Sequence, residues 1–505
     1  MPRITFVYPD FESLGIEYLM SVCLEAGYEV DYVHYEAEDP YLGRKEKKVS
    51  AERVAQRIAD TEPDVVGFSC VTDNYQHQLR CASVLKRMLP NVITIFGGVH
   101  PTVVPERVIR NPEVDCVAIG EAELSFAEFL RAGETSGGFA LPSARIKGIV
   151  YKKNGDLVGG FEEGELADLD KLPFPYKTLF FSISKHLSQT YRLISSRGCP
   201  HNCSYCLNSY LRALRGKSTV RQRTVDSVID ELIWAKGKYP VEFVWFYDDA
   251  FTTNSEWILE FCCRYKREIG LPFTCAANPH HMNTTIASAL SSAGCINVQI
   301  GVQSLSEELC TGVLQRRSSN ARIAQAITDL KEAGIMVQVD HMLGIPGDTL
   351  ELEEQGALFY NKYRPNLISV FWLTYYPKTR IVETAKQEGL LTEDDISGIE
   401  KGEGVGGSGS GSLTGGYMTR GSMRDPRSYY GIAFLFNYLP ILPRWLVSFL
   451  VKSRMYRVFR VRNFFISTVL PRFIQAVFNR KDYRARTHVA RFIDRVFMSR
   501  LKRST

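Results

Sequence analysis

The chain has 505 residues, of which 45% are apolar and 23% are charged, a composition ordinary for a globular protein of two to four domains. The first residues, MPRITFVYPDF, lack a basic region followed by a long apolar run, so we expect no signal peptide and a cytoplasmic protein. In that compartment the 12 cysteines are not a disulfide framework.

The net charge of +5 is unevenly distributed along the chain. Residues 424–505 hold 18 Lys and Arg against 3 Asp and Glu, a surplus of 15, so the rest of the chain carries a net charge of −10. This asymmetry predicts an anionic partner for the C-terminal region, which needs an explanation separate from the rest of the chain.

The N-terminal part alternates apolar, strand-like runs with helical patterns. Strands are expected at 4–9, 28–35, 65–71, 91–98 and 115–120, with helices at 12–26, 50–61 and 74–88. Strands that are apolar throughout and alternate with helices are typical of a parallel sheet covered on both faces. Residues 1–135 are therefore predicted to form a doubly wound, Rossmann-like α/β domain, in which ligands bind beyond the carboxyl ends of the strands.

A connector at 136–188 follows, with a hairpin expected around 152–156 and two prolines in LPFPY (172–176). Residues 189–390 then show six strand–helix units, which predict a partial (β/α)6 barrel with its site at the C-terminal ends of the strands. Its strands are expected at 191–196, 242–248, 272–277, 296–302, 336–344 and 367–376. Residues 391–423 are predicted to be a Gly/Ser-rich flexible segment, either a linker or a mobile lid.

The remaining residues, 424–505, are predicted to form a basic, aromatic, helical region. The run 429–451 is very apolar, but Pro440, Pro443 and Arg444 interrupt it, which argues against a straight membrane-spanning helix. Residues 490–503 have the pattern of an amphipathic basic helix. We favour attachment to a membrane surface or binding of an apolar substrate, ahead of plain packing on the barrel, with nucleic acid the least favoured partner.

Three cysteines lie together in SSRGCPHNCSYCLNS (195–209), directly after the first barrel strand. Cys199, Cys203 and Cys206 have the spacing C-x3-C-x2-C. A compact loop of three thiolates can bind three irons of a [4Fe–4S] cluster and leave the fourth iron open for a ligand. A structural zinc site is the alternative, but zinc needs four ligands, and His201 lies awkwardly between two of the cysteines.

The motif resembles that of the radical SAM enzymes, including an aromatic residue, Tyr205, before the last cysteine. In that family the open iron binds S-adenosylmethionine (SAM), and an electron from a donor such as flavodoxin or ferredoxin releases a 5′-deoxyadenosyl radical. The resemblance implies SAM contacts at the strand ends in FYDDAF (246–251), GVQS (301–304), GIPGDT (344–349) and YYPKT (375–379), with Gln303 where an acidic residue is common. The implied residues are Tyr205, Asp248, Gln303, Ser304, Gly344 and Pro346.

The N-terminal domain resembles the cobalamin-binding domain that precedes many radical SAM barrels. The first strand is not followed by G-x-G-x-x-G, which disfavours a dinucleotide. The resemblance implies cobalamin contacts in GFSCVT (67–72), FGGVHPT (96–102) and GEAE (120–123). The family's cobalt-ligating D-x-H-x-x-G is missing, and we expect the lone His100 to be structural. The implied residues are Ser69, Thr72, Gly97, Gly98, Gly120 and Glu121.

The two resemblances together imply a cobalamin-dependent radical SAM enzyme, with methyl transfer to an unactivated carbon as the leading reaction. The basic, apolar C-terminal region adds the expectation of a hydrophobic, lipid- or isoprenoid-like substrate and of a peripheral place at the cytoplasmic membrane. A radical SAM cyclase, oxidase or C–C coupling enzyme acting on a lipid or tetrapyrrole-like substrate is the first alternative. An RNA-modifying enzyme is the second, but it would need a further loop of three cysteines, which Cys23, Cys70, Cys81 and Cys116 do not form. No catalytic side chain is identified; His341, Tyr375 and Tyr376 lie near the predicted barrel mouth.

Overall fold

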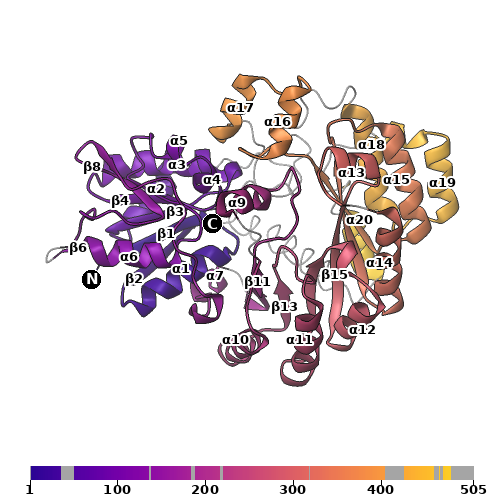
Figure 1. The fold of residues 1–505 in the computed structure, drawn as a ribbon, viewed down its shortest axis with the longest axis horizontal. Coiled ribbons are helices and arrows are strands. Elements are labelled where there is room, and N and C mark those ends of the chain that lie inside the picture. The colour runs from indigo at the N-terminus through magenta and orange to yellow at the C-terminus, as the bar shows by residue number, and fades with distance from the viewer. Residues whose placement is uncertain are drawn as a thin grey trace, which may run out of the picture.

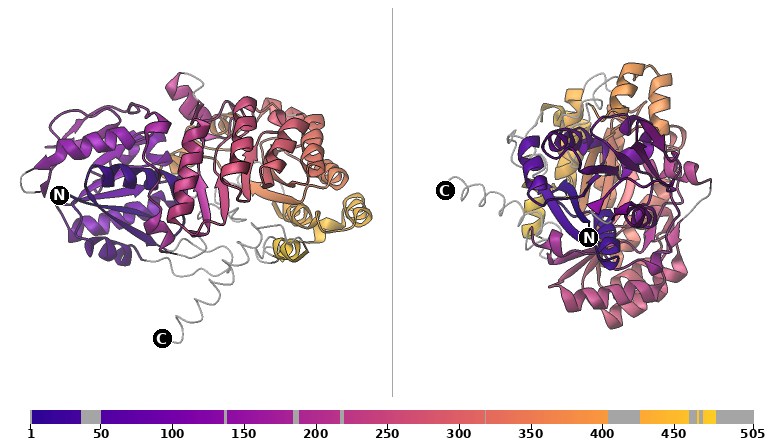
Figure 2. Two further views of the ribbon diagram at one scale, coloured as in Figure 1. Left: turned by 90° about the horizontal axis from the view of Figure 1, so that it is seen from below. Right: turned by 90° about the vertical axis from the view of Figure 1, so that its left-hand side faces the viewer.

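The computed structural model describes residues 2–35, 50–135, 138–183, 188–216, 220–317, 319–403, 426–459, 466 and 470–478. These residues form two lobes side by side, with the indigo and purple N-terminal lobe beside the barrel lobe (Figure 1). Helices from the C-terminal region, in yellow, lie on the far side of the barrel from the N-terminal lobe, and a second view shows the same arrangement from below (Figure 2).

The N-terminal lobe is the predicted doubly wound domain. Its sheet has the order β2-β1-β3-β4-β5-β8-β9, and the first five strands in that order are parallel. These parallel strands are β1 (Arg3–Pro9), β2 (Glu29–Tyr35), β3 (Val65–Ser69), β4 (Ile93–Gly97) and β5 (Cys116–Ala118). The chain reverses its direction of winding between β1 and β3, and ligands of such sheets bind at this switch point.

Helices cover both faces of this sheet, as the apolar strands require. One face packs against helices that include α2 and α3, and the other packs against α1 and α6. The helices of the domain are α1 (Leu14–Glu25), α2 (Ala51–Ala59), α3 (Thr72–Met88), α4 (Val99–Val103), α5 (Pro105–Val108) and α6 (Glu123–Gly133).

The expected hairpin of the connector is present, and it extends the N-terminal sheet. Strand β8 (Ile149–Lys153) pairs antiparallel with β5, and β9 (Asp156–Val158) pairs antiparallel with β8. The sheet of the N-terminal lobe therefore continues past residue 135 into the connector. After it, the short helix α7 (Thr178–Phe181) leads to the barrel.

The barrel lobe contains the six predicted parallel strands in chain order, without closure. They are β10 (Thr190–Leu193), β13 (Phe243–Phe246), β14 (Phe273–Ala277), β15 (Cys295–Gln303), β16 (Met336–Leu343) and β17 (Leu367–Trp372). A two-stranded pair, β11 (Ser196–Arg197) and β12 (Arg221–Gln222), brackets the cysteine loop and the helix after it. The helices of this lobe are α9 (Leu207–Arg215), α10 (Val225–Lys238), α11 (Ser255–Glu268), α12 (Thr284–Ser292), α13 (Glu307–Gly312), α14 (Asn320–Glu332), α15 (Leu350–Tyr363) and α16 (Arg380–Gln387).

The first part of the segment predicted to be flexible is instead a helix, α17 (Glu393–Glu400). Thr392 and Asp395 form a capping box at its start, and Glu400 pairs with Arg107 of the N-terminal lobe at 2.6 Å. The sequence carried the capping signal, but the Gly/Ser-rich run behind it dominated the prediction. Residues 404–423 lie outside the described part of the chain.

The described C-terminal elements pack on the barrel, which was the second-ranked expectation. They are α18 (Pro426–Tyr438), α19 (Arg444–Lys452), the 3-10 turn η4 (Met455–Val458) and α20 (Leu470–Phe478). Apolar side chains of this region, such as Ile432, Phe436 and Val447, belong to the same buried core as the barrel strands. The break between α18 and α19 falls at the predicted prolines, and no helix among the described residues is long and apolar enough to cross a membrane. The helix expected at 490–503 lies outside the described residues.

A buried group of charges joins the two lobes. Lys177 of the connector lies 2.7 Å from Glu12 and 2.5 Å from Glu17, both in the N-terminal lobe. Arg192 on β10 pairs with the other oxygen of Glu12. The side chains of Lys177, Glu12 and Glu17 are at most 2% exposed, so this group holds the two lobes together out of contact with water.

Candidate active site

The three cysteines of the predicted cluster motif lie in one loop between β11 and α9. All three are free of disulfide bonds, and Cys203 is the most buried of them. The loop is fastened to the segment after α13, because Ser204 donates its Oγ hydrogen to Val313 O (2.7 Å) and its N–H to Leu314 O (2.8 Å). Cys206 is the N-cap of α9, so the helix begins directly at the end of the motif.

A buried cation contacts this loop. Arg316 donates from Nη1 to Cys203 Sγ at 3.5 Å and from Nη2 to Gly301 O at 2.6 Å, so it links the cysteine loop to the end of β15. A Cβ on Gly301 would lie 3.0 Å from Gln303 Nε2 and 3.3 Å from Arg316 Nη2, so a side chain there would crowd both groups. Burial raises the pKa of Cys199, and it raises that of Cys206 to about 12. In the absence of iron these thiols keep their protons, and metal binding must displace them.

His201 contacts two side chains outside the cysteine loop. Its Nε2 accepts a hydrogen bond from Asn278 Nδ2 at 2.9 Å, and its ring stacks on His281 with centroids 5.3 Å apart. Burial and Arg316 lower its pKa to about 4, so the ring is neutral. Among the described residues, no three His, Cys, Asp or Glu side chains converge on a point that suits one metal ion. A cubane differs from such a site because each thiolate bonds a different iron.

Asp248, predicted to contact SAM, accepts hydrogen bonds from the segment that precedes the cysteines. Its carboxylate accepts from Ser195 N (3.1 and 3.0 Å), Ser195 Oγ (2.7 Å) and Ser196 Oγ (2.6 Å), and the side chain is buried. Burial raises its pKa despite these bonds. Asp248 is therefore a positioning residue for the loop. Its neighbour Asp249, which the sequence reasoning passed over, is close enough to Cys199 and Cys206 to raise the pKa of both.

The other predicted SAM contacts lie at the C-terminal end of the barrel. Gln303 ends β15 with a left-handed φ of 69°, a strained conformation for a non-glycine residue and one that clusters at functional sites. Ser304 follows it and is buried. Gly344 has φ 80° and donates its N–H to Asp348 Oδ2 at 3.2 Å, and Pro346 is buried in the same turn. Tyr205 and Tyr375 pack into one apolar cluster beside this turn.

His341 does not point into the barrel mouth. Its Nε2 lies 2.6 Å from Glu353 Oε2 and its Nδ1 lies 3.0 Å from Tyr360 OH, both on α15, and its ring contacts Phe436 of α18. These helices cover the outer surface of the barrel, so the side chain of His341 faces outward although its backbone lies near the C-terminal end of β16. Side chains alternate along a strand, so its neighbour Asp340 faces the interior instead.

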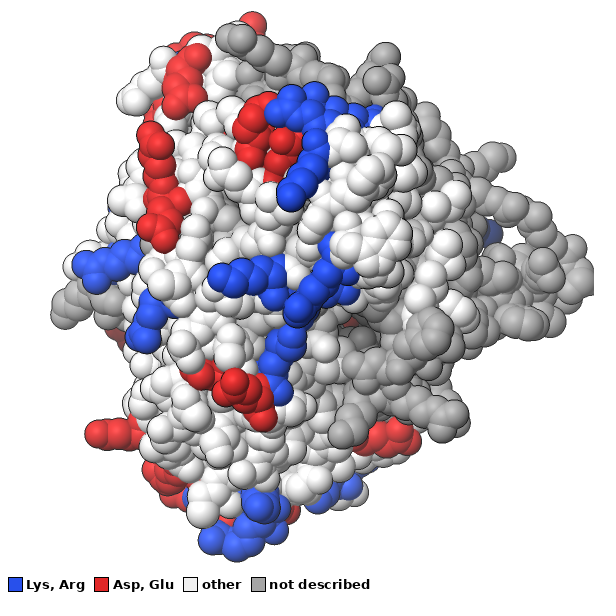
Figure 3. Space-filling view, turned by 90° about the vertical axis from the view of Figure 1, so that its right-hand side faces the viewer, with Lys and Arg blue, Asp and Glu red and all other residues white. Residues whose placement is uncertain are grey.

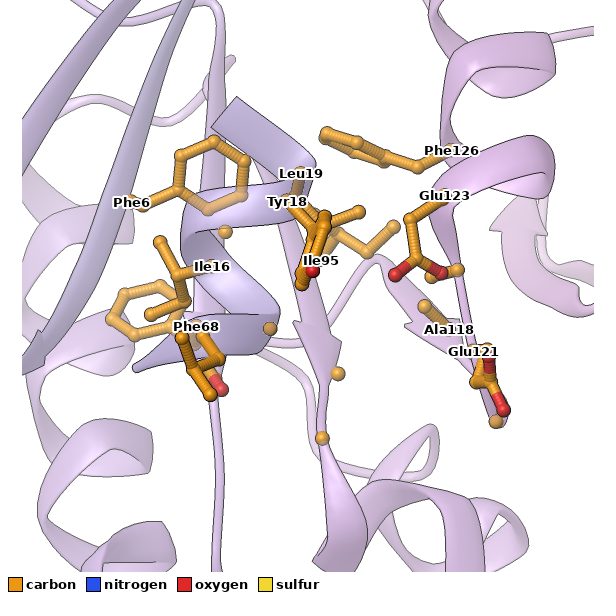
Figure 4. A pocket seen from close by; sticks show the side chains of 18 of the residues that line it. Phe6, Ile16, Tyr18, Leu19, Phe68, Ile95, Ala118, Glu121, Glu123 and Phe126 are labelled. Carbon is orange, nitrogen blue, oxygen red and sulfur yellow. The ribbon is translucent and has the colours of Figure 1, made fainter. Parts of the chain in front are cut away.

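A cavity of about 290 Å³ opens at the carboxyl edge of the N-terminal sheet. Figure 4 shows aromatic and aliphatic side chains, among them Phe6, Phe68 and Phe126, around it, with Glu121 and Glu123 at one side. The barrel supplies Ile194 and Arg197 to its wall, and Arg197 precedes Cys199 by two residues. Five residues predicted from the cobalamin resemblance line this cavity: Ser69, Gly97, Gly98, Gly120 and Glu121.

Thr72 and His100 are not among the residues that line this cavity. Thr72 is buried, and its Oγ1 lies 3.2 Å from His100 Nδ1, so it serves the packing of α3 against α4. His100 is fully buried and stacks on Tyr75 with ring centroids 4.3 Å apart, as expected for a structural histidine. Gly98 has φ 93°, and a Cβ there would lie 2.8 Å from Cys70 O, so local backbone contact already requires this glycine.

Glu121 connects the cavity to the cysteine loop. Its carboxylate pairs with Arg197 (2.6 Å), Arg215 of α9 (3.3 Å) and Arg221. Burial alone would raise the pKa of Glu121, but Arg197 and Arg221 lower it below its ordinary value. Both sides of the cysteine motif are thus tied by ion pairs to the N-terminal lobe.

The donor sets present fit the implied cofactors. Three free thiols in one loop can hold a [4Fe–4S] cluster, and the strained and glycine-containing strand ends around it leave backbone groups for SAM. The apolar cavity can take one flat part of a cobalamin, which as a whole is far larger than 290 Å³. No histidine is among the described residues that line the cavity, in keeping with the missing D-x-H-x-x-G motif.

Comparison with known proteins agrees with this organisation. The family model described as B12 binding domain matches residues 3–130, and that of the radical SAM superfamily matches residues 193–355. An uncharacterized methyltransferase of Pyrococcus horikoshii is 29% identical over 386 residues, which cover 75% of this chain and 79% of the relative. An anaerobic magnesium-protoporphyrin IX monomethyl ester cyclase of Cereibacter sphaeroides is 23% identical over 461 residues, covering 86% and 71%.

A solved structure shares the fold across nearly the whole chain. The cobalamin-dependent S-adenosylmethionine radical enzyme OxsB, with aqua-cobalamin bound, superposes with a TM-score of 0.64 at 15% identity, covering 99% of this chain and 76% of that one. Together with the two matching family models, this likeness fixes the order and the type of both domains. The chain is a cobalamin-dependent radical SAM enzyme, with a B12-binding domain before a radical SAM barrel and with cobalamin, a [4Fe–4S] cluster and S-adenosylmethionine as its cofactors.

Proposed function

We propose that this enzyme transfers a methyl group to an unactivated carbon of a lipid-like substrate. The observation that carries the proposal is the shared wall of the two sites: Arg197 lines the cavity of the B12-binding domain and stands two residues before Cys199. When bound, cobalamin supplies a transferable methyl group, and the cluster with SAM supplies a hydrogen-abstracting radical. The named methyltransferase relative supports this reaction class.

The role of the protein in this reaction is to hold the cofactor sites in fixed positions. Glu121 and its arginines hold the cysteine loop against the N-terminal lobe, while Asp248 holds the backbone that leads into the loop. The buried Lys177 group keeps the two lobes at a fixed spacing. Reactions between two bound groups depend steeply on such spacing.

The interior of the barrel bears on the substrate. Gln299 Nε2 donates to Asp340 Oδ2 (2.5 Å), and Gln338 Nε2 donates to Ser369 Oγ (3.1 Å), so polar groups line the inner face where β15, β16 and β17 meet. Arg472 of α20 donates to Ser369 Oγ as well (3.3 Å). A substrate that enters the barrel therefore needs hydrogen-bonding groups at one end, which suits an amphiphile with a polar head and an apolar body better than a plain hydrocarbon.

The working environment belongs to the same proposal. We place the enzyme in the cytoplasm, at the surface of the membrane that holds its substrate, with flavodoxin or ferredoxin as the electron donor. Nucleic acid is not proposed as the substrate. Cys23, Cys70, Cys81 and Cys116 are all buried in the core of the N-terminal lobe, on separate elements, and offer no further cluster loop.

Radical cyclisation without methyl transfer is the second candidate, and the cyclase of Cereibacter sphaeroides among the relatives favours it. The two candidates differ in the mass of the product. We would purify the enzyme anaerobically with cobalamin and incubate it with lipid extract of a host that lacks the gene, using SAM labelled in its methyl group. Methyl transfer predicts a product that gains one labelled methylene unit and is absent without cobalamin. An unlabelled product that has lost hydrogen would instead identify the cyclase reaction.

A further inference from the structure

A row of exposed apolar side chains runs along the outer edge of the C-terminal helices. On α19, Trp445 is 70% exposed and Phe449 is 52% exposed, one helical turn apart. On the neighbouring η4, Met455 and Val458 are 46% and 69% exposed. We call these four residues the α19 face. Burial of such side chains is the main source of folding free energy, so a set left in water needs an explanation.

The α19 face is not needed to dock these helices on the barrel. The opposite side of α19 and η4 provides Val447, Leu450, Val451 and Tyr456, all of which are buried in the core of the barrel lobe. The helix is thus apolar on two sides. Its inner side packs against α15, and η4 packs against α18. The outer side remains for a partner.

A cluster of cations lies at the start of α19, beside Trp445. Lys331, Arg364 and Arg444 come together where α14, α15 and α19 meet, and the exposed Lys362 near the end of α15 is the fourth cation, with its carbonyl accepting from Arg444. Lys331 donates to Tyr363 O and Arg364 O, Arg364 donates to Leu442 O at 2.7 Å, and Arg444 donates to Lys362 O. The carbonyls of Lys362, Tyr363 and Arg364 lie at the C-terminal end of α15, where the helix dipole carries about half a negative charge, so most of the positive charge of the cluster stays uncompensated.

The positive charges of the cluster also repel one another. Burial and then Arg444 lower the pKa of Arg364, and burial, Arg444 and Arg364 lower that of Lys331. By contrast, Arg454 and Arg457 at the far end of the row are paired with Glu351 and Glu354. Figure 3 shows Lys and Arg side chains gathered near the middle of this side of the molecule, next to a broad uncharged area. An anionic partner would relieve the repulsion within the cluster.

We propose that the α19 face and the cation cluster dock this enzyme onto an anionic lipid bilayer, with Trp445 and Phe449 entering the headgroup region and the four cations meeting lipid phosphates. Large exposed apolar side chains next to Lys and Arg are the pattern of interfacial membrane attachment. The sequence continues in the same character, with 12 Lys and Arg against 2 Asp and Glu from 460 to 505. The docking does not depend on the reaction proposed above, and its test involves no turnover.

The experiment is sedimentation of the anaerobically reconstituted, full-length enzyme with sucrose-loaded vesicles. One set contains phosphatidylcholine only, and the other contains phosphatidylcholine with phosphatidylglycerol. The two test variants are Trp445→Ser/Phe449→Ser and Lys362→Gln/Arg444→Gln. Matched controls place the same changes on helices α10 and α11, as Ile233→Ser/Leu259→Ser, where the residues are 49% and 42% exposed, and as Lys266→Gln/Arg267→Gln.

We expect binding to the anionic vesicles alone. Removal of two cations should weaken it roughly thirtyfold, removal of the two aromatic side chains by at least about tenfold, and the control variants should bind as the parent does. All variants should keep the melting temperature and the rate of 5′-deoxyadenosine formation, because the changed side chains are exposed. Failure of vesicle binding with SAM cleavage intact would overturn the docking and leave the proposed reaction standing.

Three other results would also overturn the proposal. The first is equal binding to neutral vesicles, and the second is undiminished binding by both test variants. In the third result the parent enzyme does not bind vesicles but binds an RNA oligonucleotide or associates with itself, and the test variants lose that RNA binding or self-association. That result would assign the face to nucleic acid or to a second copy of the chain.

Discussion

Removal of the buried lysine that joins the lobes should be the most damaging single change outside the cofactor sites. Lys177 is fully buried and lies 2.7 Å from Glu12 and 2.5 Å from Glu17, whose side chains are 2% and 0% exposed. In Lys177→Met, Arg192 still neutralises Glu12, but Glu17 loses its cation inside the protein. A buried charge left without its partner costs about 3–5 kcal/mol.

The cost should depend on pH in a defined direction. Burial raises the pKa of Glu17 well above its ordinary value even with Lys177 present, and removal of the lysine takes away the largest opposing influence. A carboxyl group with a raised folded-state pKa adds stability at low pH and loses it as the pH rises through that pKa. The variant should therefore be closest to the parent near about pH 5.5 and weakest near about pH 8.

Differential scanning calorimetry of the apoprotein measures both effects. At about 2–4 °C for each kcal/mol, the melting temperature of the N-terminal lobe should fall by about 6–20 °C near neutral pH. The double variant Lys177→Met/Glu17→Leu is the control, because it removes the stranded charge and should recover most of the loss. A loss below about 3 °C, or a loss that grows as the pH falls, would refute this reasoning.

Three further changes test the cofactor sites. Arg316→Gln removes the cation that donates to Cys203 Sγ and should lower the midpoint potential of the reconstituted cluster by tens of millivolts. The conversion is on the order of 60 mV for each 1.4 kcal/mol of lost stabilisation. EPR redox titration measures the potential, and an unchanged value would contradict the contact. Gly98→Ala forces φ 93° on a residue with a Cβ and places that Cβ 2.8 Å from Cys70 O, so the free energy of unfolding in urea should fall by about 1–3 kcal/mol. Gly15→Ala is the control, because its Cβ meets open space and should leave the free energy of unfolding unchanged. Gly97→Leu places a side chain in the cavity and should abolish the cobalamin absorbance while the iron content stays; retained cobalamin would show that the cavity is not its site.

Much of the fold could be predicted from the sequence because buried parallel strands are continuous apolar runs. The strand expected at 28–35 is Glu29–Tyr35, and the helix expected at 74–88 is Thr72–Met88. The order of the domains followed from the alternation of strand and helix patterns along the chain. The cysteine loop followed from the spacing of its three cysteines. The edge of the N-terminal sheet was harder to predict. The hairpin at 152–156 was expected, but its pairing with β5 depends on the register between strands, which the apolar pattern does not encode.

The site was predicted less completely, because its chemistry depends on contacts between distant residues. Asp248 meets Ser195 from 53 positions away, and Arg316 meets Cys203 from 113 positions away. A motif shows that Asp248 follows a strand, but not that its carboxylate accepts hydrogen bonds from Ser195 and Ser196. The outward direction of the His341 side chain could not be predicted for a related reason, since a shift of one residue along a strand moves a side chain from the inner to the outer face. The adjacent pair Arg316 and Arg317, after the strand that ends in GVQS, was the available signal for the missed cation.

Iron and acid-labile sulfide content, measured together with the yield of 5′-deoxyadenosine under reducing, anaerobic conditions, tests the cysteine loop most directly. Compared with the parent enzyme, the variant Cys199→Ala/Cys203→Ala/Cys206→Ala should lose the brown chromophore and form no 5′-deoxyadenosine, while cobalamin still binds in the N-terminal lobe. If that variant still cleaves S-adenosylmethionine, the loop does not hold the cluster.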